Sequence, residues 1–331
     1  MVFRQLIHRV WGISFVTILM AGRVYAQSNQ SIVTAPAEMG DFQSASALTL
    51  PAVSTFNGKI DYAGGNMNSY EGNNVGASVS LPVSHALGFQ ADALYSRISD
   101  LNLYSGAGHL FWRNPETGLF GLTGGYLFCD GANSINTYQI GLEGQFYYQQ
   151  FTFGAFAGIG SIDYKYSAPF IDTNPTKFVG RVSVDYYPLE NLRLGASYIN
   201  SFNNNLGRGE IEYLTPIPGV ALTGEVAFGD HGYDDWQLGI RYYFGGKKTL
   251  HDRQRQDDPP ALTTQILQSL GLYGAESSKK MAAYHAVNPG TEYSGGGYGV
   301  IITRIDPGKI PPLLPPIPTS PPATDPPPAL P

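Results

Sequence analysis

The feature that most constrains this sequence is an alternation of apolar and polar residues with a period of two. Residues 137–146 read TYQIGLEGQF, with apolar side chains at 138, 140, 142 and 146 and polar residues or glycine between them. Residues 56–62 and 236–244 repeat the pattern. Successive side chains of a β-strand point to opposite faces, whereas a helix repeats every 3.6 residues, so the pattern predicts strands with one apolar face.

Twelve such segments follow one another, and their typical length is close to the ~9–11 residues of a tilted transmembrane strand. We predict strands near residues 53–64, 74–82, 87–96, 105–113, 119–128, 135–147, 151–160, 177–187, 192–200, 207–214, 220–229 and 235–245.

The composition indicates what the apolar faces contact. Charged residues make up only 14% of the chain, against about 25% in ordinary soluble domains. Beyond the first two dozen residues, no apolar run approaches the ~20 residues of a spanning helix. Because lipid cannot satisfy exposed backbone groups, only helices and closed barrels cross it. The sequence therefore predicts an all-β fold, a transmembrane up-and-down antiparallel β-barrel of about 12 strands, with 10 as the lower bound.

The first 26 residues have the features of a signal peptide. Arg4 and Arg9 precede an apolar stretch at 10–21, and the sequence Val-Tyr-Ala at 24–26 is a suitable cleavage site before Gln27. Cleavage would remove three arginines and take the formal net charge from −6 to −9. That charge argues against nucleic acid as a partner, because nucleic acid favours a basic patch.

Composition divides the remaining chain into three parts. Residues 27–52 form a polar periplasmic lead, and residues 53–245 carry the barrel pattern. Residues 246–331 hold 15 of the 24 prolines, so we expect a periplasmic tail that is mostly disordered. A short helix at 262–272 would interrupt it, and a partner in the periplasm would give it a role.

The breaks between strands indicate the orientation of the barrel. Short turns (PVSHA, NPETG, YQQ, PLEN, TPIPG) alternate with mostly longer polar segments such as GNMNSYEGN and SIDYKYSAPFIDTNPT. Outer-membrane barrels have short periplasmic turns and longer external loops. An even number of strands then places both ends of the barrel, and the tail, on the periplasmic side.

Residues 53–245 resemble the bacterial outer-membrane β-barrels of the porin-like families. The resemblance rests on the alternation, the turn pattern and a last strand, QLGIRYYF, that ends in the aromatic Phe244. It implies an outer-membrane location, contact with lipid and recognition by the barrel-insertion machinery. Members of these families usually stop at this aromatic residue, whereas this chain continues for another 87 residues.

Aromatic residues near the strand ends of the outward face predict girdles at the lipid headgroups. The alternative is cross-strand packing in a water-soluble sandwich, which would carry more charge outside. The girdle residues are Trp112, Tyr126, Phe128, Phe146, Phe151, Tyr186, Tyr198, Trp236 and Tyr242.

The opposite face should line the lumen, and by parity it holds six cations and seven anions. One interpretation is a polar permeation path; the other is a network of ion pairs that closes a narrow barrel. The lumen-facing charges are Lys59, Asp61, Asp92, Arg113, Glu143, Arg181, Asp185, Arg193, Arg208, Glu210, Glu212, Glu225 and Arg241.

Two constellations bear on catalysis. Ser105 and His109 share the inward face, which could support acyl hydrolysis. His231 lies among Asp230, Asp234 and Asp235 and could form an acid/His or weak metal site. Both are better explained as structural residues, so we predict no enzyme, no cofactor and no metal site. Cys129, the single cysteine, excludes an intramolecular disulfide and is expected in a loop.

Three functions remain as hypotheses. The preferred one is a porin-like barrel that gives passive diffusion of small polar solutes or supports envelope integrity. The second is a structural or adhesive surface protein that binds partners through its external loops, especially residues 161–176. The third, a barrel hydrolase that uses His109, is the least favoured.

Overall fold

The computed structural model describes residues 50–99, 101–130, 135–164 and 175–287. The expected signal peptide, most of the expected lead and the end of the tail from residue 288 lie outside these ranges. No helix among the described residues is long and apolar enough to span a membrane.

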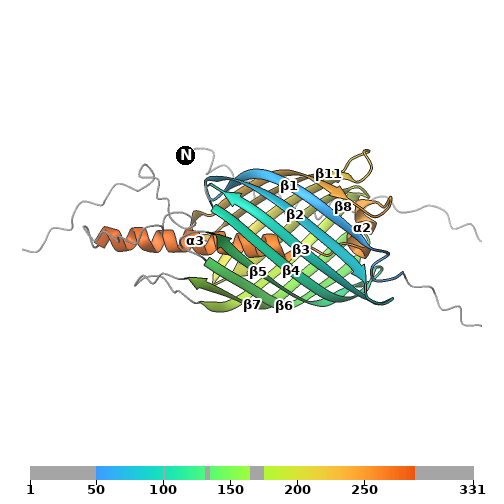
Figure 1. Ribbon diagram of the computed structural model, residues 1–331, viewed down its shortest axis with the longest axis horizontal. Helices are drawn as coiled ribbons and strands as arrows, with labels where there is room; N and C mark the ends of the chain where they lie inside the picture. Colours follow the sequence, from blue (N-terminus) through green and yellow to red (C-terminus); the bar gives the residue numbers. More distant parts are fainter. Residues whose placement is uncertain (1–49, 100, 131–134, 165–174, 288–331) are drawn as a thin grey trace, which may run out of the picture. The chain divides into compact units, whose positions relative to one another are not determined.

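Twelve antiparallel strands form one closed barrel, in which each strand pairs with its neighbours in sequence and β1 pairs with β12 (Figure 1). The predicted fold class is confirmed, and each predicted segment corresponds to one strand. The strands are β1 (Asn57–Met67), β2 (Tyr70–Pro82), β3 (Leu87–Ile98), β4 (Leu101–Asn114), β5 (Gly118–Asp130), β6 (Ile135–Tyr148), β7 (Phe151–Tyr164), β8 (Thr176–Leu189), β9 (Leu192–Ser201), β10 (Asn204–Leu214), β11 (Val220–Gly229) and β12 (Asp234–Tyr243).

The outer face of the wall is apolar over most of its length. In the middle of β6 and β12, Leu142 and Leu238 are 53% and 66% exposed. An apolar face of this extent would not be stable in water, and it matches the lipid-facing band of a membrane barrel. Of the nine predicted girdle residues, eight are exposed on this face and Tyr186 is half-buried.

Outward aromatic rings stack at both ends of the barrel. At one end, the Phe151 and Tyr186 ring centroids are 4.8 Å apart. At the other, Tyr104 and Phe128 stack at 5.1 Å. Rings in these positions suit the headgroup level of a bilayer.

The two rims of the barrel differ in what they carry. At the near rim, where β1 begins and β12 ends, the strands are joined by residues 83–86, 115–117, 149–150, 190–191 and 215–219. At the far rim the connections are residues 68–69, 99–100, 131–134, 165–175, 202–203 and 230–233. We predicted that short near-rim turns alternate with mostly longer far-rim loops. Only one far-rim connection, residues 165–175, is long, so the difference between the two rims is smaller than predicted.

Left-handed backbone conformations explain the short far-rim connections. Asn68 and Ser69 have φ angles of 50° and 72°, and Phe202 and Asn203 have 54° and 67°. Two consecutive residues with positive φ make the tight hairpin turn that suits the twist of antiparallel strands. The polar segment GNMNSYEGN thus continues β1 and β2 instead of forming a loop.

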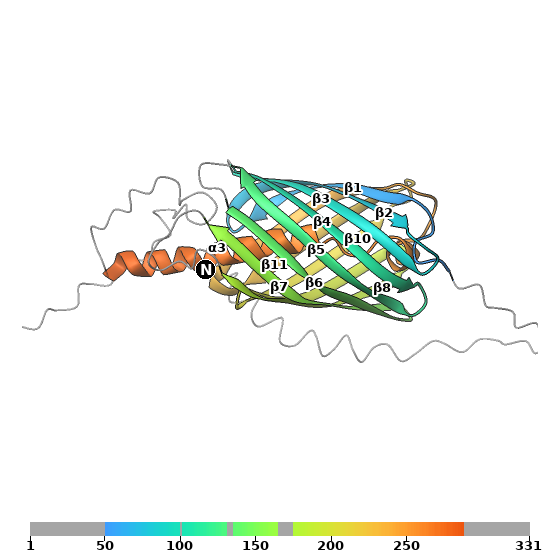
Figure 2. The same ribbon diagram turned by 60° about the horizontal axis from the view of Figure 1, so that its bottom comes forward.

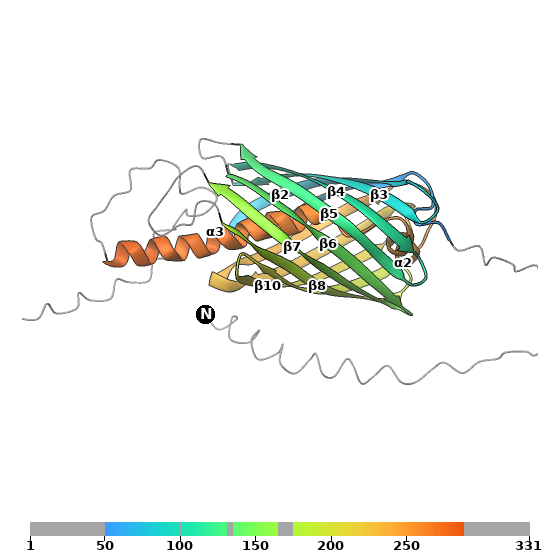
Figure 3. The ribbon, with the colours of Figure 1, turned by 90° about the horizontal axis from the view of Figure 1, so that it is seen from below.

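Beyond β12 the chain turns back and enters the barrel. A short helix, α2 (Leu250–Gln256), lies at the near rim, and α3 (Leu262–Val287) follows it. In three views α3, coloured orange, runs inside the wall of strands and projects past the far rim (Figures 1, 2 and 3). The helix predicted at 262–272 is confirmed but is longer, and residues 250–287 are more ordered than the tail predicted from the prolines.

Because the outer face is apolar, we predict that a charged residue placed on it lowers the stability of the barrel, and that the loss is largest at the middle of the membrane. Leu142→Arg places a guanidinium at mid-wall and should lower the free energy of unfolding by about 2–4 kcal/mol, whereas Tyr148→Arg at the end of β6 should cost about 0–1 kcal/mol. Guanidinium titration in lipid vesicles, followed by tryptophan fluorescence, measures both. Equal costs at the two positions would contradict a lipid-embedded wall.

Candidate functional site: a lumen occupied by the chain's own C-terminal segment

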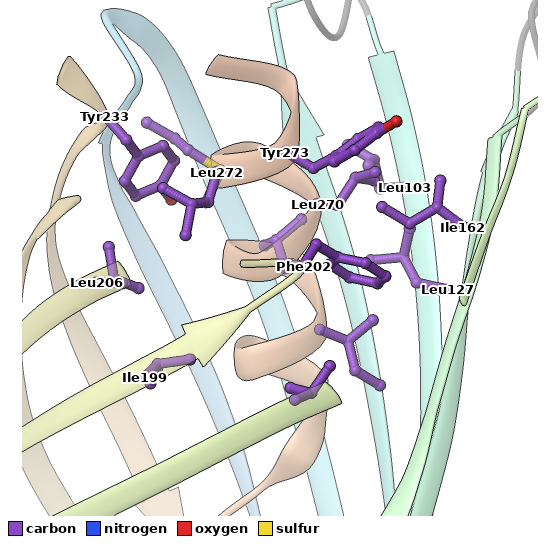
Figure 4. Packing of buried hydrophobic residues seen from close by; sticks show 14 of the residues in the cluster. Leu103, Leu127, Ile162, Ile199, Phe202, Leu206, Tyr233, Leu270, Leu272 and Tyr273 are labelled. Carbon is purple, nitrogen blue, oxygen red and sulfur yellow. The ribbon is translucent and has the colours of Figure 1, made fainter. Parts of the chain in front are cut away.

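The half of the lumen next to the far rim is lined by apolar residues, which we call the apolar collar. They come from most strands and from the far-rim connections, and several are drawn in Figure 4. The collar consists of Met67, Leu94, Leu103, Leu127, Cys129, Ile135, Phe156, Ile162, Val179, Ile199, Phe202, Leu206, Ala227 and Tyr233. This is unlike the uniformly polar inner face that parity predicted.

The first half of α3 fills the collar. Ile266 and Leu272 are fully buried, and Leu267 and Leu270 are each 1% exposed. Burying a side chain of this size contributes roughly 1.5–3 kcal/mol. The helix is enclosed on several sides, so apolar residues occur around it and not on a single face.

Polar side chains of α3 have partners on the wall. Gln265 Nε2 donates to Gln139 Oε1 at 3.0 Å. Gln268 Nε2 donates to Glu225 and, at 3.2 Å, to Asp235 Oδ2. These bonds fix the rotation of α3 relative to β6, β11 and β12, because buried polar groups need partners.

Glycines make room for the helix. A Cβ added at Gly125 of β5 would lie 2.7 Å from Ile266 Cδ1 and 2.9 Å from Ala107 Cβ. A Cβ at Gly229, at the end of β11, would lie 2.8 Å from Leu272 Cδ1. The wall therefore fits α3 at positions where any side chain would collide with it.

The other half of the lumen, towards the near rim, is polar and charged. All thirteen predicted lumen charges lie on the face opposite the exposed apolar residues. Five of them, Lys59, Asp92, Arg113, Glu143 and Glu212, are buried, and the other eight are half-buried.

Glu212 is the centre of an ion-pair network across β1 and β8–β12. Its carboxylate accepts from Arg241 Nη1 at 3.0 Å and from the Tyr243 hydroxyl at 2.6 Å, and it lies 3.5 Å from Arg193 Nη2. Arg193 also pairs with Asp185 at 2.8 Å. Arg208 completes the network through Glu210 and Glu225, at 2.6 and 3.1 Å.

Arg181 differs from the other arginines of this group. No ion pair within 4.0 Å is found for it among the described residues, whereas Arg193 and Arg241 are paired. Arg181 lines a cavity of about 100 Å³ together with Ser183, Ser197 and residues 258–261 of the tail. The charged half of the lumen thus keeps a small space beside residues 258–261, which lead to α3.

Residues 248–258 fasten the tail to the near rim, and we call this segment the latch. Lys248 Nζ pairs with Asp257 at 2.6 Å, and Lys59 Nζ pairs with Asp258 at the same distance. The Ser54 hydroxyl donates to Asp257 at 2.7 Å. Within α2, Arg253 donates to the carbonyl oxygens of Phe244 and Gly246 and stacks over the Tyr243 ring, and Arg255 donates to that of Phe151.

A hydrogen bond holds α3 at the far rim as well. Asn204 Nδ2 donates to Glu276 Oε2 at 2.7 Å, and Lys280 Nζ pairs with Glu276 Oε1 at 2.5 Å. Burial opposes ionisation of Glu276, but the bonds from Lys280 and Asn204 outweigh it and lower the pKa of the carboxyl below its usual value.

The hydrolase constellation is not assembled. Both ring nitrogens of His109 contact carboxylates, Nδ1 with Glu143 and Nε2 with Asp92, each at 2.9 Å. The Ser105 hydroxyl instead donates to the Tyr126 carbonyl at 3.0 Å. The acids that sequence reasoning could not identify beside His109 are present, but they occupy both of its nitrogens and leave none for a nucleophile.

The second His/Asp group forms hydrogen bonds with the barrel wall. His231 Nε2 contacts Asn204 Oδ1 at 2.8 Å, and Asp230 accepts from the backbone and side chain of Asn205. In the described part of the chain, no group of three or more His, Cys, Asp and Glu side chains could hold a metal. Cys129 lies in β5 and the apolar collar, so its expected position in a loop was wrong.

Comparison with known proteins gives similarity at the level of structure only. No family model matches the chain, and no curated protein sequence is detectably similar. Among solved structures, the KdgM porin matches with 14% identity and a TM-score of 0.40, covering 56% of this chain and 99% of its own.

Two further structures match less well. Omp33 of Acinetobacter baumannii has 10% identity, a TM-score of 0.35 and coverages of 57% and 98%. The translocator domain of the autotransporter NalP from Neisseria meningitidis has 12% identity, a TM-score of 0.29 and coverages of 57% and 87%. Such values carry no argument about function. What the structure shows is the fold: a closed barrel of twelve antiparallel strands with a largely apolar outer face.

The buried network predicts that Glu212 is important for stability. Glu212→Gln keeps the shape but removes the charge between Arg193 and Arg241, and breaking buried pairs of this kind costs about 3 kcal/mol. Asp61→Asn is the matched control, because Asp61 is half-buried and lies 3.7 Å from Arg241; it should cost less than about 1 kcal/mol. Denaturant titration of both variants in lipid vesicles measures their free energies of unfolding. A similar loss of stability in the two variants would contradict the prediction.

Proposed function

We propose that this protein is an outer-membrane barrel whose lumen is closed by its own C-terminal segment, so that small polar solutes pass only when α3 leaves. The observation that carries the proposal is the apolar collar packed around α3. An α-helix with its side chains is about 10–12 Å across, and here apolar side chains of the collar surround the first half of α3. The polar wall residues Gln139, Glu225 and Asp235 that also face the helix are hydrogen-bonded to it.

The polar half favours a porin-like role for the emptied barrel. Its mixed charges and its cavity beside Arg181 would form a hydrated path with weak selectivity. Free passive diffusion through the intact protein, the preferred hypothesis from the sequence, is not supported by the filled collar. The closed form suits envelope integrity instead.

Conductance distinguishes these states. In planar bilayers the full-length protein should be silent. Ile266→Asp combined with Leu270→Asp places two unpaired charges in the collar, at a cost of several kcal/mol each, and should release α3 and give discrete conductance steps. Single-channel recording of both proteins provides the measurement.

A matched control separates loss of the plug from a general effect of added charge. Ala283→Asp changes an exposed position of the same helix and should remain silent. The proposal fails if the native protein conducts, or if the double variant migrates as a folded, heat-modifiable barrel and is still silent.

A further inference from the structure

We propose that the barrel displays its C-terminal segment: α3 leaves the lumen at the far rim, so that its last residues, up to Val287, and the chain that continues from them are presented outside the cell. The function is that of a membrane anchor for an exposed segment, and it does not depend on the barrel being closed to solutes. It also reverses the periplasmic location that the sequence predicted for the tail.

The contacts of the tail follow one direction through the lumen. Asp258 pairs with Lys59, two residues from the start of β1 at the near rim. Farther along the chain, Ile266 lies against the Gly125 position, the Tyr273 ring lies 5.9 Å from that of Phe202, and Glu276 bonds to Asn204. Phe202 lies in the connection between β9 and β10 at the far rim, and Asn204 is the first residue of β10. The order of contacts along the lumen therefore follows the order of the sequence.

The length of α3 takes the chain beyond this rim. Eleven residues of the helix follow Glu276, and at 1.5 Å per residue they extend about 16 Å farther. Figures 1, 2 and 3 agree in showing this part of α3 outside the wall of strands.

The near rim is the side that faces the periplasm. Both ends of the wall are there, because the strand number is even, and the residues before β1 pack on it: the Ala52 amide donates to the His85 carbonyl at 2.7 Å. A chain exported by an N-terminal signal reaches the membrane from the periplasm, and the longest connection, 165–175, is at the far rim, as in outer-membrane barrels. The tail must therefore emerge outside.

Epitope accessibility in intact cells tests the inference on the full chain. One epitope follows Pro331, a second lies within residues 165–174, and a third lies in the 115–117 turn at the near rim. The first two should bind antibody and be removed by added protease in intact cells, and the third only after permeabilisation. A C-terminal epitope that behaves like the third would overturn the inference.

A pair of glycine variants tests whether display requires the path through the lumen. Gly125→Phe occupies the space of Ile266, and the surface signal at Pro331 should fall at least tenfold while that of 165–174 is kept. In Gly144→Phe the new Cβ meets only Leu119 O, at 3.6 Å, and the signal should be unchanged. If the Gly125→Phe protein assembles correctly and its C-terminal epitope is as accessible as in the native protein, the chain does not reach the surface through the lumen. If this variant does not assemble, the accessibility of the C-terminal epitope in the native protein tests the inference alone. These experiments do not depend on whether the barrel conducts, so the tail could be displayed even if the conductance prediction under the proposed function is wrong.

Discussion

The pairing of β1 with β12 is the constraint on which the rest of this structure depends. The register runs without interruption from Lys59 opposite Tyr243 to Met67 opposite Asp235. Because an unpaired strand edge cannot be satisfied in lipid, the wall must close, and closure of an even number of strands brings its first and last residues to one rim. The tail therefore starts beside the opening of the lumen, and a turn of six residues before α2 is enough to direct it inwards.

The apolar collar and α3 each require the other. Inward residues such as Leu127 and Ile162 are fully buried only because a helix fills the space, and an empty lumen would expose them to water. In the same way, the residues of α3 that contact the collar lie on more than one face, so this helix would be poorly soluble alone. Burial of apolar surface thus makes the C-terminal segment a part of the fold and not an appendix to it.

The wall could be predicted from the sequence because its physics is local. The alternation with a period of two indicates which side chains of a strand face lipid. The side chains at the intervening positions, such as Arg193 and Glu212, are then predicted to lie on the inner face. The turns were harder, since a consecutive pair such as Asn68 and Ser69 reads as a polar loop although both residues adopt positive φ. The boundaries of the strands at the far rim were therefore predicted too short.

The occupied lumen could not be predicted by the same reasoning. A signal was present, because residues 126–129 (YLFC) are apolar on both faces, which a strand between lipid and water would not be. The latch depends on contacts such as Lys59 with Asp258, which are 199 positions apart, and no local pattern reports such a pair. High proline content also suggested disorder throughout the tail, although residues 262–287 contain none.

The two prolines between the latch and α3 have a physical role in the lumen. Residues 258–261 cross the charged half without regular secondary structure. Backbone N–H groups there would have to find partners among side chains already engaged in ion pairs. Pro259 and Pro260 have no N–H to satisfy, and the carbonyl of Pro259 accepts from Gln90 Nε2 at 3.1 Å. The division of the lumen follows from this. A chain with few backbone donors can cross the polar half, and in the apolar half the same chain satisfies its own backbone groups as a helix.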